Sequence, residues 1–221
     1  MNLFKKQSDA QRFLLRIVPK GFHWWTSGIA TDKTKLDKLS EKYAEHYGTE
    51  LKPWERSYRK KKGLANAHFV AASLPISECE GGYIWFLVAN DGRGMIRENS
   101  KLKDARTNAG RITWNDYVMY EAPRHRLEGG GTRWSWYLKV EVQKKIDHHV
   151  GQLLKTAPHE LSGFLAAQLK RPLHHGIRHW LSRLIKRAHQ NFKRMHPDEE
   201  WRGWEPVNPL PAFGQYQSDD E

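Results

Sequence analysis

The sequence predicts an α+β fold in which a mainly antiparallel sheet of about five strands is followed by a helical C-terminal section. Three observations support this fold class. Residues 111–122 and 132–142 alternate between apolar and polar side chains, as strands with one buried face do. Residues 83–89 form a continuous apolar run, which is typical of a strand buried on both faces. From residue 143 onward, apolar side chains recur every three or four positions, which is the period of a helix.

The N-terminal part of the chain predicts a strand, an extended segment and a helix. Residues 12–18 alternate weakly and end in β-branched side chains, so we expect a first strand there. The aromatic cluster at residues 22–25 is expected to be extended. Thr31-Asp32 can cap a helix over residues 33–47, and Gly48 suits the position just after its last turn.

Two further strands are predicted at residues 65–74 and 83–90, the second in the centre of the sheet. Residues 90–94 read Asn-Asp-Gly-Arg-Gly, which predicts a turn. The polar residues 95–110 show no clear pattern, so we expect a loop that can contain a short helix.

A long antiparallel hairpin is predicted for residues 111–122 and 132–142, because both segments alternate and a turn-rich stretch separates them. Its tip, residues 124–131, is expected to be a flexible basic loop. The residues expected on the buried face of the hairpin are Ile112, Trp114, Val118, Tyr120, Trp134, Trp136, Leu138, Val140 and Val142.

Three helices are predicted after the hairpin, at residues 143–154, 158–169 and 172–195, with a break at residues 156–158. In the third helix the expected buried positions are Leu173, Ile177, Trp180, Leu181, Leu184, Ile185, Ala188, Phe192 and Met195. Its opposite face is expected to present His175, Arg178, His179, Arg183, Lys186, Gln190 and Lys193.

Residues 1–197 are predicted to form a single α+β domain, sheet-rich over residues 1–142 and helical over residues 143–197. Residues 198–221 differ in composition, because they hold seven acids against Arg202 alone and are interrupted by three prolines. We expect an acidic and partly disordered tail there. Such a tail either covers the basic surface or only solvates the terminus.

The composition excludes several classes of protein. No apolar run approaches the roughly 20 residues that span a bilayer, so no transmembrane segment is expected. No signal peptide is visible at the N-terminus, and the expected compartment is therefore the cytoplasm. Cys79 is the one cysteine, which rules out an internal disulfide and a zinc site built from cysteines. No basic group in the sequence adjoins Cys79 to activate it as a catalytic thiol.

The charge of the chain points to an anionic partner. The formal net charge is +12, and the sequence pI is near 9.7. Residues 52–62 hold six cations against Glu55 alone, and residues 161–197 contain no acid at all. A solvated helix face normally mixes both signs, so an acid-free stretch of this length favours nucleic acid as the partner. An acidic protein surface, an anionic membrane surface and a merely solvated helix are the alternatives.

The sequence favours a non-enzymatic nucleic-acid-binding protein that contacts the phosphate backbone through its last long helix. The predicted contact residues are Lys52, Arg56, Arg59, Lys60, Lys61, Lys62, Arg124, Arg126, Arg178, Arg183, Lys186 and Lys193. Four aromatic residues are predicted to stack on unpaired bases, namely Trp24, Trp25, Trp54 and Tyr58. The main alternative is an interaction or inhibitory protein that docks on an acidic surface, for example of a replication or conjugation component.

A metal-dependent nuclease is the second alternative. Such enzymes place an acid on one strand of a hairpin and another acid on the next strand, and Asp116 and Glu141 have this spacing in the predicted hairpin. His175 and His179 are four residues apart on the predicted helix, but no acid nearby in the sequence completes a metal site. The glycine-rich segments lack a nucleotide-binding pattern, so we expect neither a metal nor a cofactor.

Overall fold

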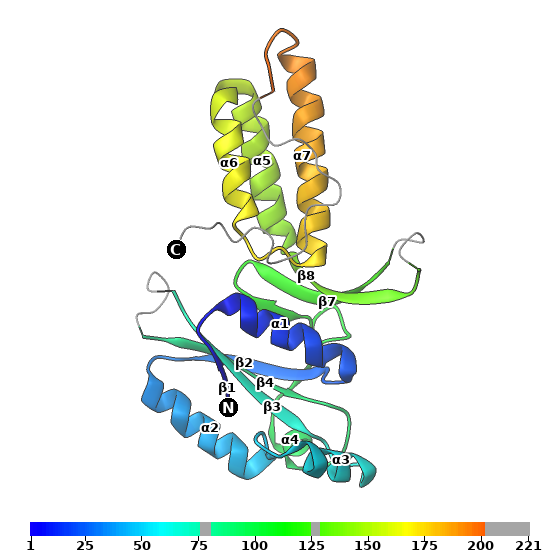
Figure 1. Cartoon of the computed structure of the whole chain (residues 1–221). Coiled ribbons are helices and arrows are strands. Elements are labelled where there is room, and N and C mark those ends of the chain that lie inside the picture. Colours follow the sequence, from blue (N-terminus) through cyan, green and yellow to red (C-terminus); the bar gives the residue numbers. More distant parts are fainter. Residues whose placement is uncertain (76–80, 125–128, 202–221) are drawn as a thin grey trace. The chain divides into compact units, whose positions relative to one another are not determined.

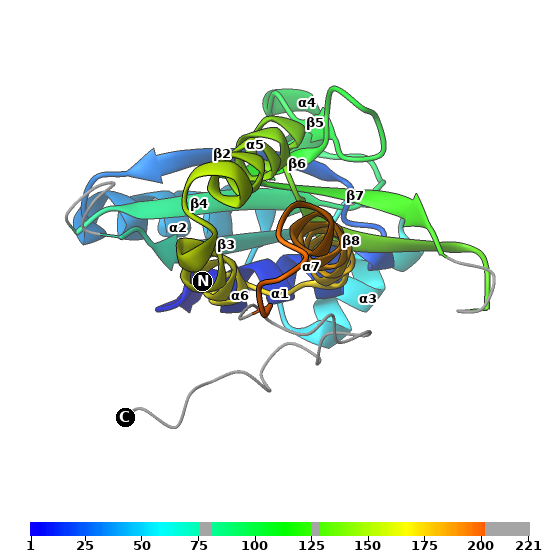
Figure 2. The ribbon, with the colours of Figure 1, turned by 90° about the horizontal axis from the view of Figure 1, so that it is seen from above.

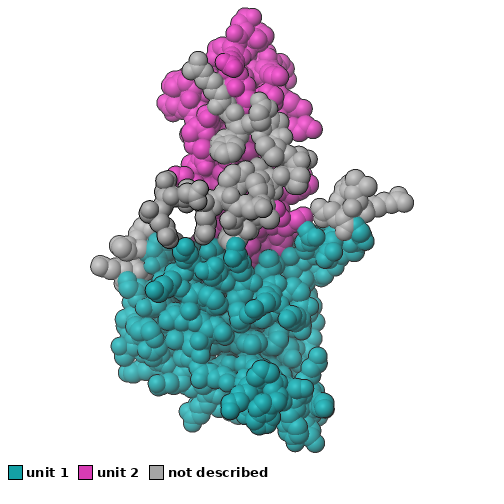
Figure 3. Space-filling view, viewed as in Figure 1, with its two compact units in different colours: residues 1–112, 120–134 teal, residues 113–119, 135–221 magenta. Residues whose placement is uncertain are grey.

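The computed structural model describes residues 1–75, 81–124 and 129–201, and it confirms the α+β class (Figure 1). The chain divides into two compact units, which Figure 3 shows in different colours. Unit 1 consists of Met1–Ile112 and Tyr120–Trp134. Unit 2 consists of Thr113–Met119 and Ser135–Glu221. Cys79, Arg126 and the predicted tail from residue 202 onward lie outside the described residues.

Unit 1 contains a five-stranded, mainly antiparallel sheet, as the sequence predicts. Its strands follow the order β1 (Asn2–Phe4), β3 (Ala67–Ser73), β4 (Tyr83–Ala89), β2 (Trp24–Ala30) and β5 (Lys103–Asp104). Figure 2 shows β3, β4 and β2 side by side. Only β1 and β3 run parallel. The predicted central position of β4 is confirmed, because β3 and β2 pair with its two edges. Residues 86–89 are all buried, so side chains on both faces of the strand are buried, which explains the continuous apolar run.

Helices cover both faces of this sheet (Figure 1). Helix α2 (Lys33–Tyr47) packs on one face, where Tyr43 contacts the rings of Phe69 and Trp85. Helix α1 (Gln7–Ile17) packs on the other face, where the ring of Phe13 lies 5.8 Å from that of His68. The short helix α4 (Met95–Asn99) adds Ile96 to the core on the α2 side.

The predicted caps of α2 are confirmed. The Asp32 side chain accepts a hydrogen bond from the Lys35 amide at 2.8 Å. Gly48 follows the last turn with a φ of 65°, a left-handed conformation that glycine adopts without steric strain. These local signals need no tertiary partner, which explains why the sequence predicts both ends of the helix.

The strand predicted at residues 12–18 is wrong. These residues belong to α1 and to a short 3-10 helix, η1 (Val18–Lys20). The buried residues of α1 include Ala10, Leu14 and Ile17, which recur at helical spacing. Ile17 and Val18 are β-branched and favour a strand locally, but the helical period starts at Ala10, before residue 12, and burial of that face decides the structure.

The basic residues 52–62 form a helix, α3 (Pro53–Lys61). Pro53 takes the first helical position, where its missing amide hydrogen has no consequence. The Glu55 carboxylate accepts a hydrogen bond from the Lys52 amide at 2.6 Å, which satisfies a free donor at the helix start. The end of α3 joins the predicted turn at residues 90–94, because the Arg93 amide donates to the Gly63 carbonyl at 2.9 Å.

A second sheet has the order β6 (Ile112–Trp114), β7 (Tyr117–Pro123) and β8 (Thr132–Leu138), and its residues are divided between the two units. Strands β7 and β8 are sheet neighbours with a short connection, so they run antiparallel as predicted. The predicted buried face is only partly right. Asn115, with a φ of 48°, breaks the first strand in two and shifts the alternation by one residue, so that Tyr117 and Met119 are buried in place of Val118 and Tyr120.

The predicted strand also extends too far at its C-terminal end. Strand β8 stops at Leu138, and helix α5 (Val140–Thr156) begins two residues later. Val140 is exposed in the first turn of α5, in contrast to its predicted buried position. The alternating valines at the start of α5 extend the strand pattern, whereas the buried residues of the helix begin at Ile146.

The C-terminal helices of unit 2 are confirmed with shifted boundaries. After α5, the chain breaks at Pro158, as predicted, and continues through a 3-10 helix, η3 (Pro158–Glu160), and α6 (Leu161–Leu169). Helix α7 (His175–Met195) begins three residues later than predicted. In Figure 1 helices α5, α6 and α7 lie side by side. The predicted apolar positions are buried from Leu173 to Phe192, but Met195 is exposed.

The start of α7 packs closely on β8. A Cβ atom on Gly176 would lie 2.4 Å from the Tyr137 ring and 2.7 Å from the Trp136 carbonyl oxygen. The Gly176 amide donates to the Ser135 hydroxyl at 3.0 Å, in the interior of unit 2. Only glycine permits this approach, which holds the helix rigidly at its N-terminus.

Candidate nucleic-acid interface

Helix α7 presents one strongly cationic face in unit 2. The helix contains six Lys or Arg residues and no Asp or Glu. Its apolar face is buried against the other helices, so the backbone beneath the cations is held in place. The exposed polar residues along the other face are His179, Arg183, Lys186, Arg187, Gln190, Lys193 and Arg194.

A hollow of about 390 Å³ lies between α7 and α5. Its lining residues are Gln143, Asp147, Trp180, Arg183, Lys186, Arg187 and Gln190. The Trp180 side chain is only 6% exposed, so it contributes an apolar floor. Cationic side chains surround this floor, so the hollow suits an anionic group of a ligand.

The cations of this face are largely uncompensated. Asp147 is the one acid of the hollow, and its carboxylate pairs with the Arg187 guanidinium at 2.9 Å. Within residues 1–75, 81–124 and 129–201, no ion pair involves Arg183, Lys186 or Lys193. Arg178, also predicted as a contact residue, is half-buried and interacts within the fold.

The predicted contact residues of α3 divide into two groups. Lys52, Lys60, Lys61 and Lys62 are exposed in unit 1. Arg56 instead turns inward, and its guanidinium donates to the carbonyls of Leu51, Thr49 and Ala67 at 2.9, 2.6 and 2.6 Å.

Arg59 makes the same kind of contact, since its guanidinium donates to the Ala65 carbonyl at 2.8 Å. These two half-buried arginines tie α3 to the segment that leads into and begins β3, so their guanidinium groups are engaged within unit 1. Burial is the main cause that lowers the pKa of Arg56 from its ordinary value.

The four predicted stacking residues also differ in accessibility. Trp54 and Tyr58 are 68% and 60% exposed on α3. Trp25 is only 2% exposed, and its indole nitrogen donates to the Gly110 carbonyl at 2.6 Å, so its predicted role in stacking is wrong. Trp24 is already covered, because the Arg97 guanidinium lies 3.3 Å from the centre of its ring.

Trp24 belongs to a charged network in unit 1 that the sequence did not reveal. Its indole nitrogen donates to Asp91 at 2.7 Å, and Arg106 pairs with both Asp91 and Asp104. The hydrogen bond from Trp24 is the main cause that lowers the pKa of Asp91, and the hydrogen bond from Arg106 is the main cause that lowers the pKa of Asp104. Trp24 begins β2, Asp91 lies in the turn after β4, and Asp104 and Arg106 lie at and just after β5, so only the fold brings these residues together.

The predicted hairpin tip is only partly described. Arg124 is exposed at the end of β7, and its amide donates to the Gly131 carbonyl at 2.9 Å. Arg126 and His125 lie in the range 125–128, outside the described residues.

The nuclease hypothesis loses its geometric basis. Asp116 lies in the turn between β6 and β7 and pairs with Arg171 at 3.1 Å. Glu141 lies in the first turn of α5. Neither carboxylate occupies the strand position that the predicted motif requires. The rings of His175 and His179 are stacked 6.5 Å apart, and no group of three potential metal ligands occurs among the described residues.

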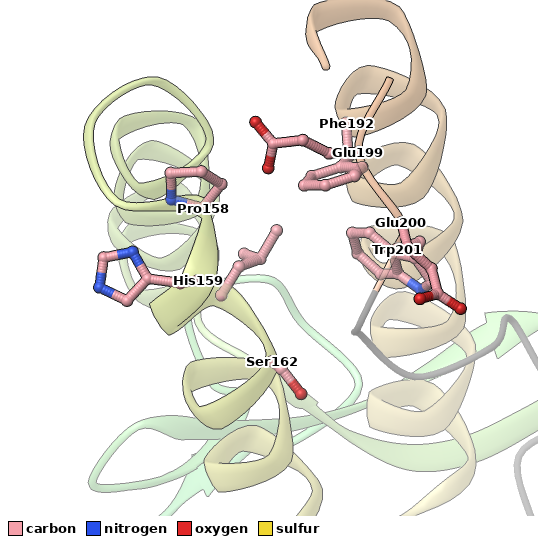
Figure 4. A pocket seen from close by; sticks show the side chains of 8 residues that line it. Pro158, His159, Ser162, Phe192, Glu199, Glu200 and Trp201 are labelled. Carbon is pink, nitrogen blue, oxygen red and sulfur yellow. The ribbon is translucent and has the colours of Figure 1, made fainter. Parts of the chain in front are cut away.

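A second hollow of about 420 Å³ in unit 2 has the opposite character. Phe192 and Trp201 form an aromatic wall, with ring centres 5.3 Å apart. In Figure 4 the Glu199 carboxylate points across the hollow toward Pro158, and Glu200 lies beside Trp201. These carboxylates would repel a phosphate, so this hollow is not part of the cationic face.

Comparisons of the chain with models of protein families, with curated proteins and with solved structures found no match. Among the described residues, no helix has the length and apolar character needed to cross a membrane. The chemistry of the described surfaces is therefore the basis for a functional assignment.

Proposed function

We propose that the protein binds nucleic acid without catalysing a reaction on it, and that the cationic face of α7 contacts the phosphate backbone. The acid-free sequence of α7, presented on a helix whose apolar face is buried, supports this proposal most. Phosphate contacts of this kind give affinity and orientation rather than sequence readout.

The spacing of the cations suits a polyanion. Residues 183–193 cover about 15 Å of helix at about 1.5 Å per residue. Cations recur in this span at Arg183, Lys186, Arg187 and Lys193. Each phosphate that they neutralise releases counterions, so the logarithm of the binding constant should fall by about 0.9 per contact for each tenfold rise in salt.

The test is the fluorescence anisotropy of labelled single-stranded DNA, duplex DNA and RNA over a salt series. The triple variant Arg183→Glu, Lys186→Glu and Lys193→Glu should lower the affinity at least 100-fold at physiological salt, because it replaces contacts with repulsion. A matched control reverses three exposed lysines of unit 1, namely Lys20, Lys38 and Lys101. Both variants change the net charge by the same amount, and the control should bind almost as the wild type does.

Equal losses in both variants would reduce the effect to net charge, and undiminished binding by the α7 variant would remove this face from the interface. The competing function is docking on an acidic protein surface. The hollow above Trp180 supports it, because this hollow can accommodate an anchoring side chain of a partner protein. Absence of nucleic-acid binding by the wild-type protein near 150 mM salt would favour that function.

A further inference from the structure

Helix α3 exposes and covers side chains in the reverse of the usual pattern for a surface helix. Surface helices bury their aromatic residues and leave arginines in solvent. In α3 no residue is buried, Trp54 and Tyr58 are exposed, and the guanidinium groups of Arg56 and Arg59 turn inward. Of the Phe, Tyr and Trp side chains that the structure describes, only these two are in the exposed class.

The two rings share one face of the helix. They are four residues apart, which places them about 6 Å apart along the helix axis at about 1.5 Å per residue. The inward hydrogen bonds of Arg56 to three carbonyls fix the rotation of the helix about its axis. The rings are therefore held out toward solvent rather than turned to the core.

The surroundings of the two rings are cationic. Lys52, Lys60, Lys61 and Lys62 are all exposed, and the Lys62 ammonium lies 5.7 Å from the centre of the Tyr58 ring. Glu55 is the one acid of the helix, and its carboxylate is engaged with the Lys52 amide. Charge complementarity thus requires a partner that is anionic and that also offers flat apolar groups.

Unpaired nucleic acid meets both requirements, because each nucleotide carries a phosphate and a base with two free faces. Bases in a duplex already stack on one another, so they cannot stack on a protein ring without being unstacked. An acidic protein would satisfy the lysines, but it supplies no regular series of flat rings.

We propose that α3 is a stacking platform for unpaired DNA or RNA, with bases on Trp54 and Tyr58 and phosphates on the neighbouring lysines. This inference rests on the proposed function, because it assumes nucleic acid as the ligand. The inference specifies the class of ligand as single-stranded nucleic acid. The cationic face of α7 alone gives no such preference for single strands.

The test uses the full chain with three probes, namely a single-stranded oligothymidine, the same length of abasic single strand and a duplex. The double variant Trp54→Ala and Tyr58→Ala should bind oligothymidine about 10- to 100-fold more weakly, which is the loss expected for one or two stacked bases. Its affinities for the abasic strand and the duplex should stay within about twofold of the wild-type values, because phosphate contacts are unchanged.

Two further variants separate stacking from a change in folding. Trp54→Phe with Tyr58→Phe should keep most of the affinity, because phenylalanine retains an aromatic face. Ile29→Ala, at an apolar residue in unit 1 that is also exposed, should bind all three probes as the wild type does.

The outcomes distinguish the two proposals. If the wild type binds nucleic acid and the alanine variant loses no affinity for oligothymidine, or loses it equally for all three probes, the stacking inference is overturned while the proposed function stands. If the wild type binds none of the probes, both proposals fail, and an acidic protein becomes the partner that the lysines of α3 favour.

Discussion

Helices α3 and α7 are both rich in basic residues, yet they expose different parts of their sequences. Helix α7 buries Trp180 and directs Arg183 and Lys186 to solvent. Helix α3 directs Trp54 to solvent and uses Arg56 inside unit 1. The comparison teaches that a cluster of basic residues in a sequence identifies neither which cations are accessible nor which aromatic residues belong to the core.

The largest expected effect is a difference in stability between two tryptophan substitutions. Trp180→Ala should lower the free energy of unfolding by about 3–5 kcal/mol, because it empties a buried position in unit 2. Trp54→Ala should change it by about 0.5 kcal/mol or less, because the ring is already in solvent. Urea denaturation, followed by circular dichroism, measures both. A large loss in Trp54→Ala would mean that α3 depends on this ring, and would contradict the comparison.

The next effect is the pH dependence of stability, which is linked to the inward-turned Arg56 of α3. His68 lies on β3 between the rings of Phe13 and Phe22, with ring centres 5.8 and 4.7 Å away. Burial, followed by the positive charges of Arg56 and Arg16, lowers the pKa of His68 to about 4. The positive charge of Arg56 thus acts on His68, a side chain of the sheet in unit 1.

A lowered histidine pKa makes the fold sensitive to acid. Below about pH 6.5 the unfolded chain binds a proton at His68, whereas the folded protein does not until about pH 4. The stability contributed by neutral His68 is therefore present above pH 6.5 and decreases by about 3 kcal/mol as the pH falls to 4. Urea midpoints from pH 7 to 4 should show this decrease, and His68→Gln should remove most of it. An unchanged slope in that variant would assign the acid sensitivity to other groups.

The smallest expected effect is a gain in DNA affinity when the acid beside the cationic face of α7 is removed. Asp147→Asn removes the one acid of the hollow between α5 and α7 and frees Arg187 for a phosphate. Affinity for duplex DNA should rise about two- to fourfold, while stability should change by less than about 1 kcal/mol, because the ion pair is solvent-exposed. Asp37→Asn on α2, in the exposed pair with Lys33, is a matched control and should leave affinity nearly unchanged. Equal gains in the two variants would indicate a general charge effect.

Sequence patterns predicted best where the structural cause is local. The caps at Asp32 and Gly48 and the 3.6-residue period of α7 depend on residues within a few turns of one another, and the structure confirms them. The alternation of the hairpin predicted its strands but not the whole of its buried face, because one backbone turn at Asn115 reverses the side-chain parity.

By itself, the sequence determined the fold class, the acid-free helix and the excess of positive charge. Only the tertiary structure decided that Arg56 and Arg59 act inside unit 1 and that Trp54 and Tyr58 face solvent. The reason is that a guanidinium turns inward only where carbonyl oxygens are positioned to accept its hydrogen bonds. The carbonyls of Ala65 and Ala67, which accept from Arg59 and Arg56, lie just before β3 and at its first residue. The positions of such hydrogen-bond partners follow from the packing of α3 on the sheet, which is a property of the whole unit and not of the helix sequence.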